Sequence, residues 1–180
     1  MKKSKLVKLA LLVFVAYLLP RSIQAQDKDA EKLMSESDKA KTEFIKTDPS
    51  MAALFESSYG YVIFPKIGKG GFIVGGSGGE GIIYEKGKAI GVVKTGQVTV
   101  GAQVGGQTYR EVIFFENEDP LTRMKASKME FSSQLSAVAV KSGVSKNAKY
   151  TDGVAVFTQD LGGLMAEATV GGQKFKYKAF

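Results

Sequence analysis

Glycine is concentrated in one part of this chain, in a stretch that is otherwise rich in Val, Ile, Phe and Tyr. Fifteen of the 21 glycines lie between Gly60 and Gly106. Glycine disfavours helices and suits turns and bulges, whereas β-branched and aromatic residues favour strands. Within residues 97–104, four apolar residues alternate with polar ones: Val98, Val100, Ala102 and Val104. Such alternation is typical of a strand, so we expect a folded sheet here rather than a low-complexity segment.

The spacing of apolar residues predicts helices at three places: residues 27–46, 50–57 after Asp48-Pro49, and 117–128. Strands are predicted over the following segments, the earlier ones separated by glycine-rich turns: residues 59–66, 72–75, 81–84, 89–93, 97–104, 108–116, 131–140, 153–158, 164–170 and 174–179. Strands and helices do not alternate as βαβ units. The expected fold class is therefore α+β, with N-terminal helices packed on a twisted antiparallel sheet that is sandwich-like or a partial barrel.

The N-terminus has the three-part pattern of a secretory signal. Residues 1–8 are basic, Leu9–Leu19 is an uninterrupted apolar run, and Ala25-Gln26 is a plausible cleavage site. A membrane-spanning helix needs about 20 apolar residues, which is more than this run provides, although an uncleaved anchor stays the alternative. We predict a signal peptide at 1–25, a helical segment at 26–58 and a glycine-rich antiparallel β-domain with one inserted helix at 59–180, so that residues 26–180 form a single domain. The chain would then be exported: periplasmic, associated with the outer membrane, or secreted.

The charge distribution argues against a nucleic-acid partner. The formal net charge is +7, from 25 basic and 18 acidic residues. Residues 1–25 hold five of the basic residues and no acid, which leaves 20 basic and 18 acidic residues in the rest of the chain. A protein with so small a net charge has no strong global attraction to nucleic acid.

Composition also excludes several kinds of catalysis. The chain has neither His nor Cys, so it lacks a Ser-His-Asp triad, a thiolate nucleophile and the commonest metal ligands. Residues 76–81 match the pattern GxGxxG, but the strand-like residues 82–84 follow where a nucleotide-binding loop would open a helix. We expect no enzyme activity, no catalytic or metal-binding residues, no cofactor and no nucleotide ligand. An enzyme without His or Cys, using a Ser-Lys or carboxylate mechanism, is a minor alternative.

Lysine alternates with apolar residues at the C-terminus. In a strand, Lys174, Lys176 and Lys178 would share one face. This pattern suits a basic stripe for lipid headgroups, but an edge strand that lysines protect from aggregation is the interpretation we favour. A small integral outer-membrane β-barrel is a further alternative for the whole chain. The three lysines would then be in phase with the terminal Phe180 and face lipid, which argues against it.

Five segments, taken in order, resemble the SYLF domain family, which is described as lipid-binding and, in its yeast members, actin-binding. The resemblance extends from about Glu31 to Tyr177. It is specific because all five segments occur in this order, whereas none of them is specific by itself. The segments are Tyr59–Phe72 (YGYVIFPKIGKGGF), Gly75–Gly81 (GGSGGEG), Gly105–Phe115 (GGQTYREVIFF), Asp152–Phe157 (DGVAVF) and Gly162–Phe175 (GGLMAEATVGGQKF).

The SYLF resemblance implies non-catalytic binding of phospholipid, often of phosphoinositides through an amphipathic N-terminal helix and a basic surface. Here residues 27–46 carry six acids and five lysines, so this helix is not a basic membrane anchor. An exported chain would also not meet actin. We therefore expect binding to phospholipid or to the envelope membrane surface. The expected contact residues are Lys66, Lys69 and Phe72 near the glycine-rich turns, together with Lys174, Lys176 and Lys178.

Overall fold

The computed structural model describes residues 28–131 and 137–180, without the side chains of residues 103, 130, 131 and 164–171. The predicted signal peptide at 1–25 and part of the strand predicted at 131–140 lie outside the described residues. The helices are the first helix (residues 28–47), α2 (Met51–Ser57), α3 (Glu118–Lys125) and the 3-10 turn η1 (Val144–Asn147). The strands are β1 (Gly60–Glu85), β2 (Lys88–Phe115), β3 (Glu130–Phe131), β4 (Val138–Ala139) and β5 (Val154–Ala179).

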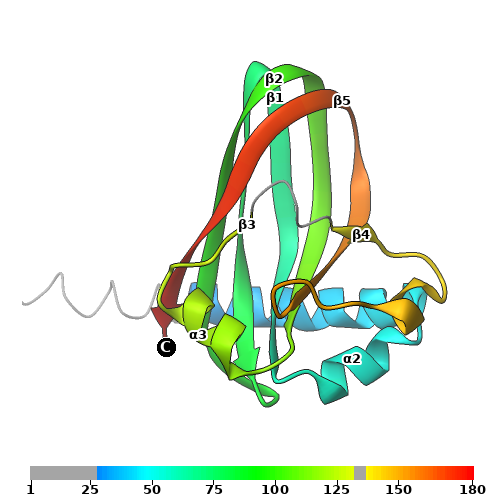
Figure 1. Ribbon diagram of the computed structural model, residues 1–180, viewed down its shortest axis with the longest axis vertical. Coiled ribbons are helices and arrows are strands. Elements are labelled where there is room, and N and C mark those ends of the chain that lie inside the picture. Colours follow the sequence, from blue (N-terminus) through cyan, green and yellow to red (C-terminus); the bar gives the residue numbers. More distant parts are fainter. Residues whose placement is uncertain (1–27, 132–136) are drawn as a thin grey trace, which may run out of the picture.

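Three very long strands dominate the sheet. Its strands are ordered β1-β2-β5-β3, each antiparallel to the next, and β4 adds a short parallel pairing to β5. Figure 1 shows the long strands rising away from the helices, curving over at the far end and returning. We call residues 60–71 and 75–85 the two limbs of β1, and residues 88–100 and 104–115 the two limbs of β2. Helices packed on an unclosed, largely antiparallel sheet confirm the predicted α+β class.

The prediction that glycine-rich turns separate short strands is wrong. Pairing between β1 and β2 continues from Gly60↔Phe115 to Glu85↔Lys88, and only the two-residue turn Lys86-Gly87 connects them. At the bend, β2 has three residues between Val100 and Val104 where β1 has one, and this bulge curves the sheet. Most of the glycines therefore lie within continuous strands.

Close packing of the two limbs of β1 requires glycine. A Cβ atom added to Gly81 in the second limb would overlap the carbonyl oxygen of Ile63 and lie 2.7 Å from Cδ1 of Phe64, both in the first limb. A side chain at Gly79 would likewise lie 2.6 Å from the carbonyl oxygen of Lys66. The two limbs of β1 can thus pack closely only because Gly79 and Gly81 place no side chain between them.

Near the helices, the sheet is buried on both faces, which explains the continuous apolar run Tyr61–Phe64. Tyr61 and Ile63 pack with Phe44 of the first helix and Phe55 of α2. Val62 and Phe64 belong to a second cluster that contains residues of α3. Successive residues of a strand point to opposite faces, so a strand covered on both sides needs apolar residues at every position. This doubly covered region is the base of the molecule.

A buried carboxylate joins the helical segment to the loop before β5. Asp48 is 1% exposed, and its oxygens accept hydrogen bonds from the backbone N–H groups of Ser50 (3.1 Å), Gly143 (3.1 Å) and Ser145 (2.8 Å). The Ser50 hydroxyl also donates to Asp48. Burial alone would raise the pKa of Asp48, but these hydrogen bonds outweigh it and hold the pKa well below its usual range.

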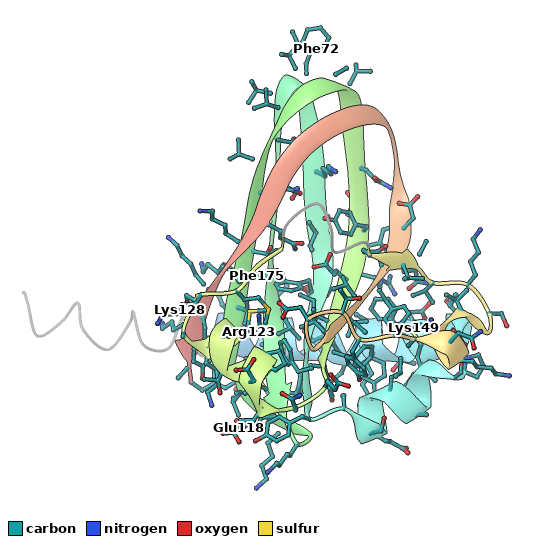
Figure 2. All side chains as sticks on the ribbon, in the orientation of Figure 1. Phe72, Glu118, Arg123, Lys128, Lys149 and Phe175 are labelled. Carbon is teal, nitrogen blue, oxygen red and sulfur yellow. The ribbon has the colours of Figure 1, made fainter. Side chains whose placement is uncertain are left out.

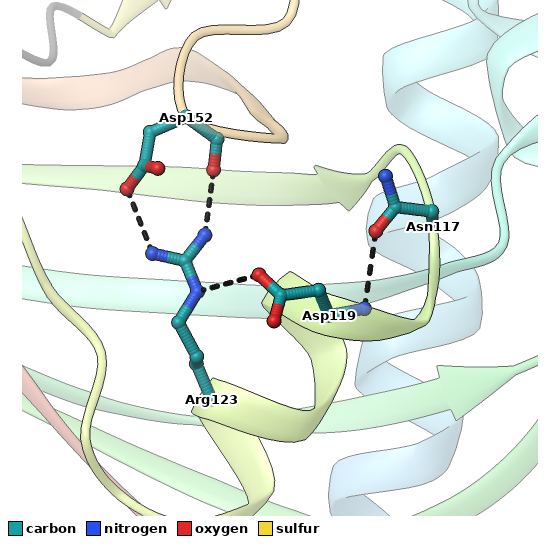
Figure 3. Close-up of polar contacts among 4 residues, drawn as sticks. All are labelled: Asn117, Asp119, Arg123 and Asp152. Atoms are coloured by element: carbon teal, nitrogen blue, oxygen red, sulfur yellow. Dashed lines mark hydrogen bonds and ion pairs between the residues drawn. The ribbon is translucent and has the colours of Figure 1, made fainter.

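Arg123 clamps α3 to the turn that precedes β5 (Figure 3). Its Nη1 and Nη2 atoms donate to the side-chain Oδ2 and the carbonyl oxygen of Asp152, both at 2.7 Å. Its Nε lies 3.2 Å from Oδ2 of Asp119, one helical turn earlier. Asn117 caps the same helix by accepting a hydrogen bond from the N–H of Asp119. The planar guanidinium uses both sides of its fork, which an ammonium group cannot do.

We expect Arg123→Ala to lower the free energy of unfolding by about 1 kcal/mol, because a partly exposed but bidentate pair is lost. Arg123→Lys should recover little of this, since lysine cannot reproduce the fork. Denaturation in urea would measure both variants. Lys32→Ala is the control, because Lys32 lies 3.9 Å from Glu36 in an exposed pair. An equal loss in the control would contradict the assignment.

Candidate functional site

Large apolar side chains are exposed together at the bend of the sheet, far from the helices. Figure 2 shows Phe72 at this end of the molecule, and its side chain is 71% exposed. Five more exposed residues lie at the same bend of β1 and β2. We call the whole set the tip: Phe72, Ile73, Val74, Val98, Val100 and Val104.

Strand register brings the residues of the tip together. Phe72 pairs with Val104, and Val74 pairs with Val100. The first limb of β2 carries its apolar residues outward here: Val98 and Val100 are exposed, whereas the intervening Thr99 is only 1% exposed. The predicted alternation is therefore present, but its apolar residues Val98 and Val100 meet solvent, whereas Thr99 of the other face lies inside. An apolar surface facing outward in this way is characteristic of a binding surface.

A polar layer crosses the interior between the tip and the base. The side-chain amide of Gln173, in β5, lies 2.9 Å from Oγ1 of Thr95 and 2.9 Å from Oε1 of Glu111. Thr95 and Glu111 belong to the two limbs of β2. Glu111 is 3% exposed, and its burial raises its pKa to about 7, although the hydrogen bond from Gln173 acts in the opposite direction.

The lysines predicted as contact residues lie along the limbs rather than at the bend. Lys66 is exposed and Lys69 is half-buried, both in the limb of β1 that leads to Phe72. Phe72 is thus the only one of the predicted contact residues in the tip. The other tip residues were missed, although the alternation of residues 97–104 pointed to Val98, Val100 and Val104. Their exposure depends on how much of the sheet the helices cover, and the alternation of residues in one strand carries no information about that.

Lys174, Lys176 and Lys178 are exposed on the last part of β5. Lys174 pairs with Gly96, and Lys176 pairs with Lys94, which forms an ion pair with Glu80. The stripe therefore runs along the same sheet toward Val98. On its other side, this part of β5 pairs with β3 only at Gln173 and Lys174 among the described strands. A headgroup-binding stripe and a protected edge are both compatible with this position.

The described side chains contain no group of three or more His, Cys, Asp or Glu residues placed to hold a metal ion. Within residues 28–131 and 137–180, none of the helices combines the length and the apolar character needed to cross a bilayer.

The sequence has a distant similarity to a known bacterial protein. No protein-family model matches the chain. The chain is 27% identical over 147 residues to Beta cell expansion factor A of Aeromonas veronii. The alignment includes 77% of this chain and 53% of that protein, so the chain spans about half the length of the curated relative it matches. Most of this chain is therefore similar in sequence to about half of that bacterial protein.

Proposed function

We propose that this protein is an exported, non-catalytic member of the SYLF family that binds phospholipid at the surface of the cell-envelope membrane through the tip. The observation that carries the proposal is the group of six large apolar side chains exposed at one end of the sheet. Transfer of apolar surface from water into a membrane is favourable by about 25 cal/mol per Å². None of the helices within residues 28–131 and 137–180 covers the tip, so it can enter the interfacial region of a bilayer while the base stays in water.

Charge on the neighbouring limbs supports an anionic membrane surface as the target. Lys174 lies opposite Gly96, two residues before Val98 of the tip, and Lys176 and Lys178 continue along the strand. Lysines near an anionic membrane contribute about 1 kcal/mol each. Lys66 is exposed on the β1 limb that leads to Phe72. The SYLF resemblance of the sequence, with its implied phospholipid binding, supports the same function.

Phe72→Ser should weaken binding to phospholipid vesicles about tenfold, because one exposed aromatic side chain no longer enters the membrane. Co-sedimentation with vesicles of phosphatidylglycerol and phosphatidylcholine measures this. The matched control is Phe180→Ser: Phe180 is 60% exposed and follows β5 at the C-terminus, near α3 and far from the tip (Figure 1). The control should bind like the wild type. Absence of wild-type binding to any vesicle, or an equal loss in the control, would refute the proposal.

The lysines are tested separately by charge reversal. Lys174→Glu combined with Lys176→Glu should weaken binding to vesicles that contain phosphatidylglycerol and leave binding to pure phosphatidylcholine vesicles unchanged. Added salt should have the same selective effect, because it screens exposed charges. An unchanged affinity for the anionic vesicles would remove the stripe from the binding surface and support its interpretation as a protected edge.

A further inference from the structure

The polar layer beneath the tip connects parts of the sheet that are distant in sequence. Gln173 contacts Thr95 in the first limb of β2 and Glu111 in its second limb, so one amide joins both limbs to β5. Thr95 Oγ1 also donates to the carbonyl oxygen of Lys174 at 3.4 Å. On the base side, Ile113 and Phe175 follow Glu111 and Gln173 by two residues and are buried. The layer therefore joins both limbs of β2 to β5 on the bend side of these two buried residues.

Glu111 accepts its hydrogen bond from a neutral amide, and three of the charged residues near it lie on the opposite face of the sheet. Lys94, Arg110 and Lys174 each adjoin a member of the layer in sequence, so strand alternation places them on the opposite face of the sheet. Lys94 is engaged by Glu80. In β1, Lys69 is half-buried and in register with Gln107, which shares a face with Glu111, and the exposed Lys66 lies in the irregular pairing between Phe64↔Glu111 and Ile67↔Tyr109. In β5, the exposed Asp160 pairs with Tyr109, and Glu130 of β3 is in register with Lys174.

The composition makes Glu111 unusual in this chain. A buried carboxyl group whose burial raises its pKa to about 7 changes its charge near neutral pH. Histidine is the side chain that normally titrates there, and the chain has none. If the folded sheet changes with pH near neutrality, this carboxyl group is therefore the group that we expect to titrate.

We propose that Glu111, Gln173 and Thr95 form a proton-sensitive tie that holds the limbs of the sheet together beneath the tip, and that loss of the Glu111 proton loosens the tip. In the protonated state the carboxyl group is neutral and tolerates the dry interior. After ionisation, the hydrogen bond from Gln173 offsets only part of the cost of the buried charge, and separation of the limbs, which admits water, relieves the rest. Any effect on membrane binding rests on the proposed function, whereas the tie itself does not.

The direction and size of the effect follow from linkage. The closed state binds the Glu111 proton more tightly than an open state with an ordinary pKa of 4.5. The closed state therefore loses stability as the pH rises from about 4.5 to about 7 and changes little above that. Between pH 5.5 and pH 8, the open fraction of the tip should increase by up to roughly thirtyfold.

Hydrogen exchange of the full chain without membranes tests the tie, with labelling times scaled to the intrinsic exchange rate at each pH. Peptides from residues 95–107 should lose protection by up to roughly thirtyfold between pH 5.5 and pH 8, while peptides from the base stay protected. Glu111→Gln mimics the protonated form, so its tip should stay protected at both pH values. Glu80→Gln, an exposed glutamate of β1, is the matched control and should respond like the wild type.

Equal protection of the wild-type tip at both pH values, or a wild-type response in Glu111→Gln, would overturn the inference. A second measurement covers the case in which Glu111→Gln fails to fold. In the wild type, a ¹³C NMR titration of the glutamate carboxyl groups should show one midpoint near pH 7, and absence of any midpoint between about pH 6 and pH 8 would also overturn it. Vesicle binding is measured separately, so a failure of the proposed function leaves this result intact.

Discussion

Gly81→Ala should destabilise the protein by about 3 kcal/mol or more, enough to prevent stable folding in many small domains. The added methyl group would overlap the carbonyl oxygen of Ile63 and press on the ring of Phe64 at 2.7 Å. A backbone oxygen in a paired strand cannot rotate away, so the limbs of β1 must separate. Separation would expose residues of both buried clusters. Urea denaturation followed by circular dichroism would measure the loss.

Gly68→Ala is the matched control, because it makes the same chemical change in the same strand. No heavy atom lies within 4 Å of a Cβ atom placed at Gly68. We expect its effect on the free energy of unfolding to stay within about 0.5 kcal/mol, as for most exposed substitutions. If the two variants were equally destabilised, a general loss of glycine flexibility would explain the result better than the contact between limbs.

Asp48→Ala should lower the free energy of unfolding by about 3 kcal/mol. The substitution removes the acceptor of three backbone N–H groups: that of Ser145, which is buried, and those of Ser50 and Gly143, which are part-buried. It also releases η1 from the start of α2. Asp160→Ala is the control, since the exposed Asp160 accepts a single local hydrogen bond from the N–H of Gly162. Thermal or urea denaturation at neutral pH should separate the two variants, and equal losses would contradict the role of Asp48.

Asp48 and Glu111 should affect the pH dependence of stability in opposite directions. The pKa of Asp48 is held below its ordinary value of 3.8 in the folded protein, so its contribution is present above about pH 4 and is lost as the pH falls further. The pKa of Glu111 is raised, so its contribution is lost as the pH rises toward 7. The free energy of unfolding of Asp48→Ala, measured against pH, should therefore fall less than that of the wild type as the pH drops below about 4. Its decrease as the pH rises toward 7 should be the same as in the wild type.

The helices were predictable because their information is local. The 3–4 residue spacing predicted residues 27–46, and the first helix occupies residues 28–47. The third predicted helix contains α3. Strand residues were also recognised, but the number of strands was not. Glycine permits a turn, a bend and close packing of backbones alike, and sequence alone does not distinguish these roles.

The candidate site was predictable only in part. Phe72 was identified beside the glycine-rich segment, and the alternation of Val98 and Val100 was visible. Which face of that alternation would be covered depends on contacts between distant elements: the first helix and α2 pack over the base and stop short of the bend. The layer of Thr95, Glu111 and Gln173 has no local signal, because its members come from positions up to 78 residues apart.

The sequence by itself determined the α+β class, the helical positions, the strand-forming segments and the lack of histidine and cysteine chemistry. Each of these follows from residue type and short-range spacing. The tertiary structure alone decided that the strands fold over as three continuous ribbons, that the described helices leave the apolar tip exposed and that Glu111 is buried between limbs. These features depend on which distant surfaces meet, because burial and register are set by long-range packing rather than by the neighbours of a residue in the chain.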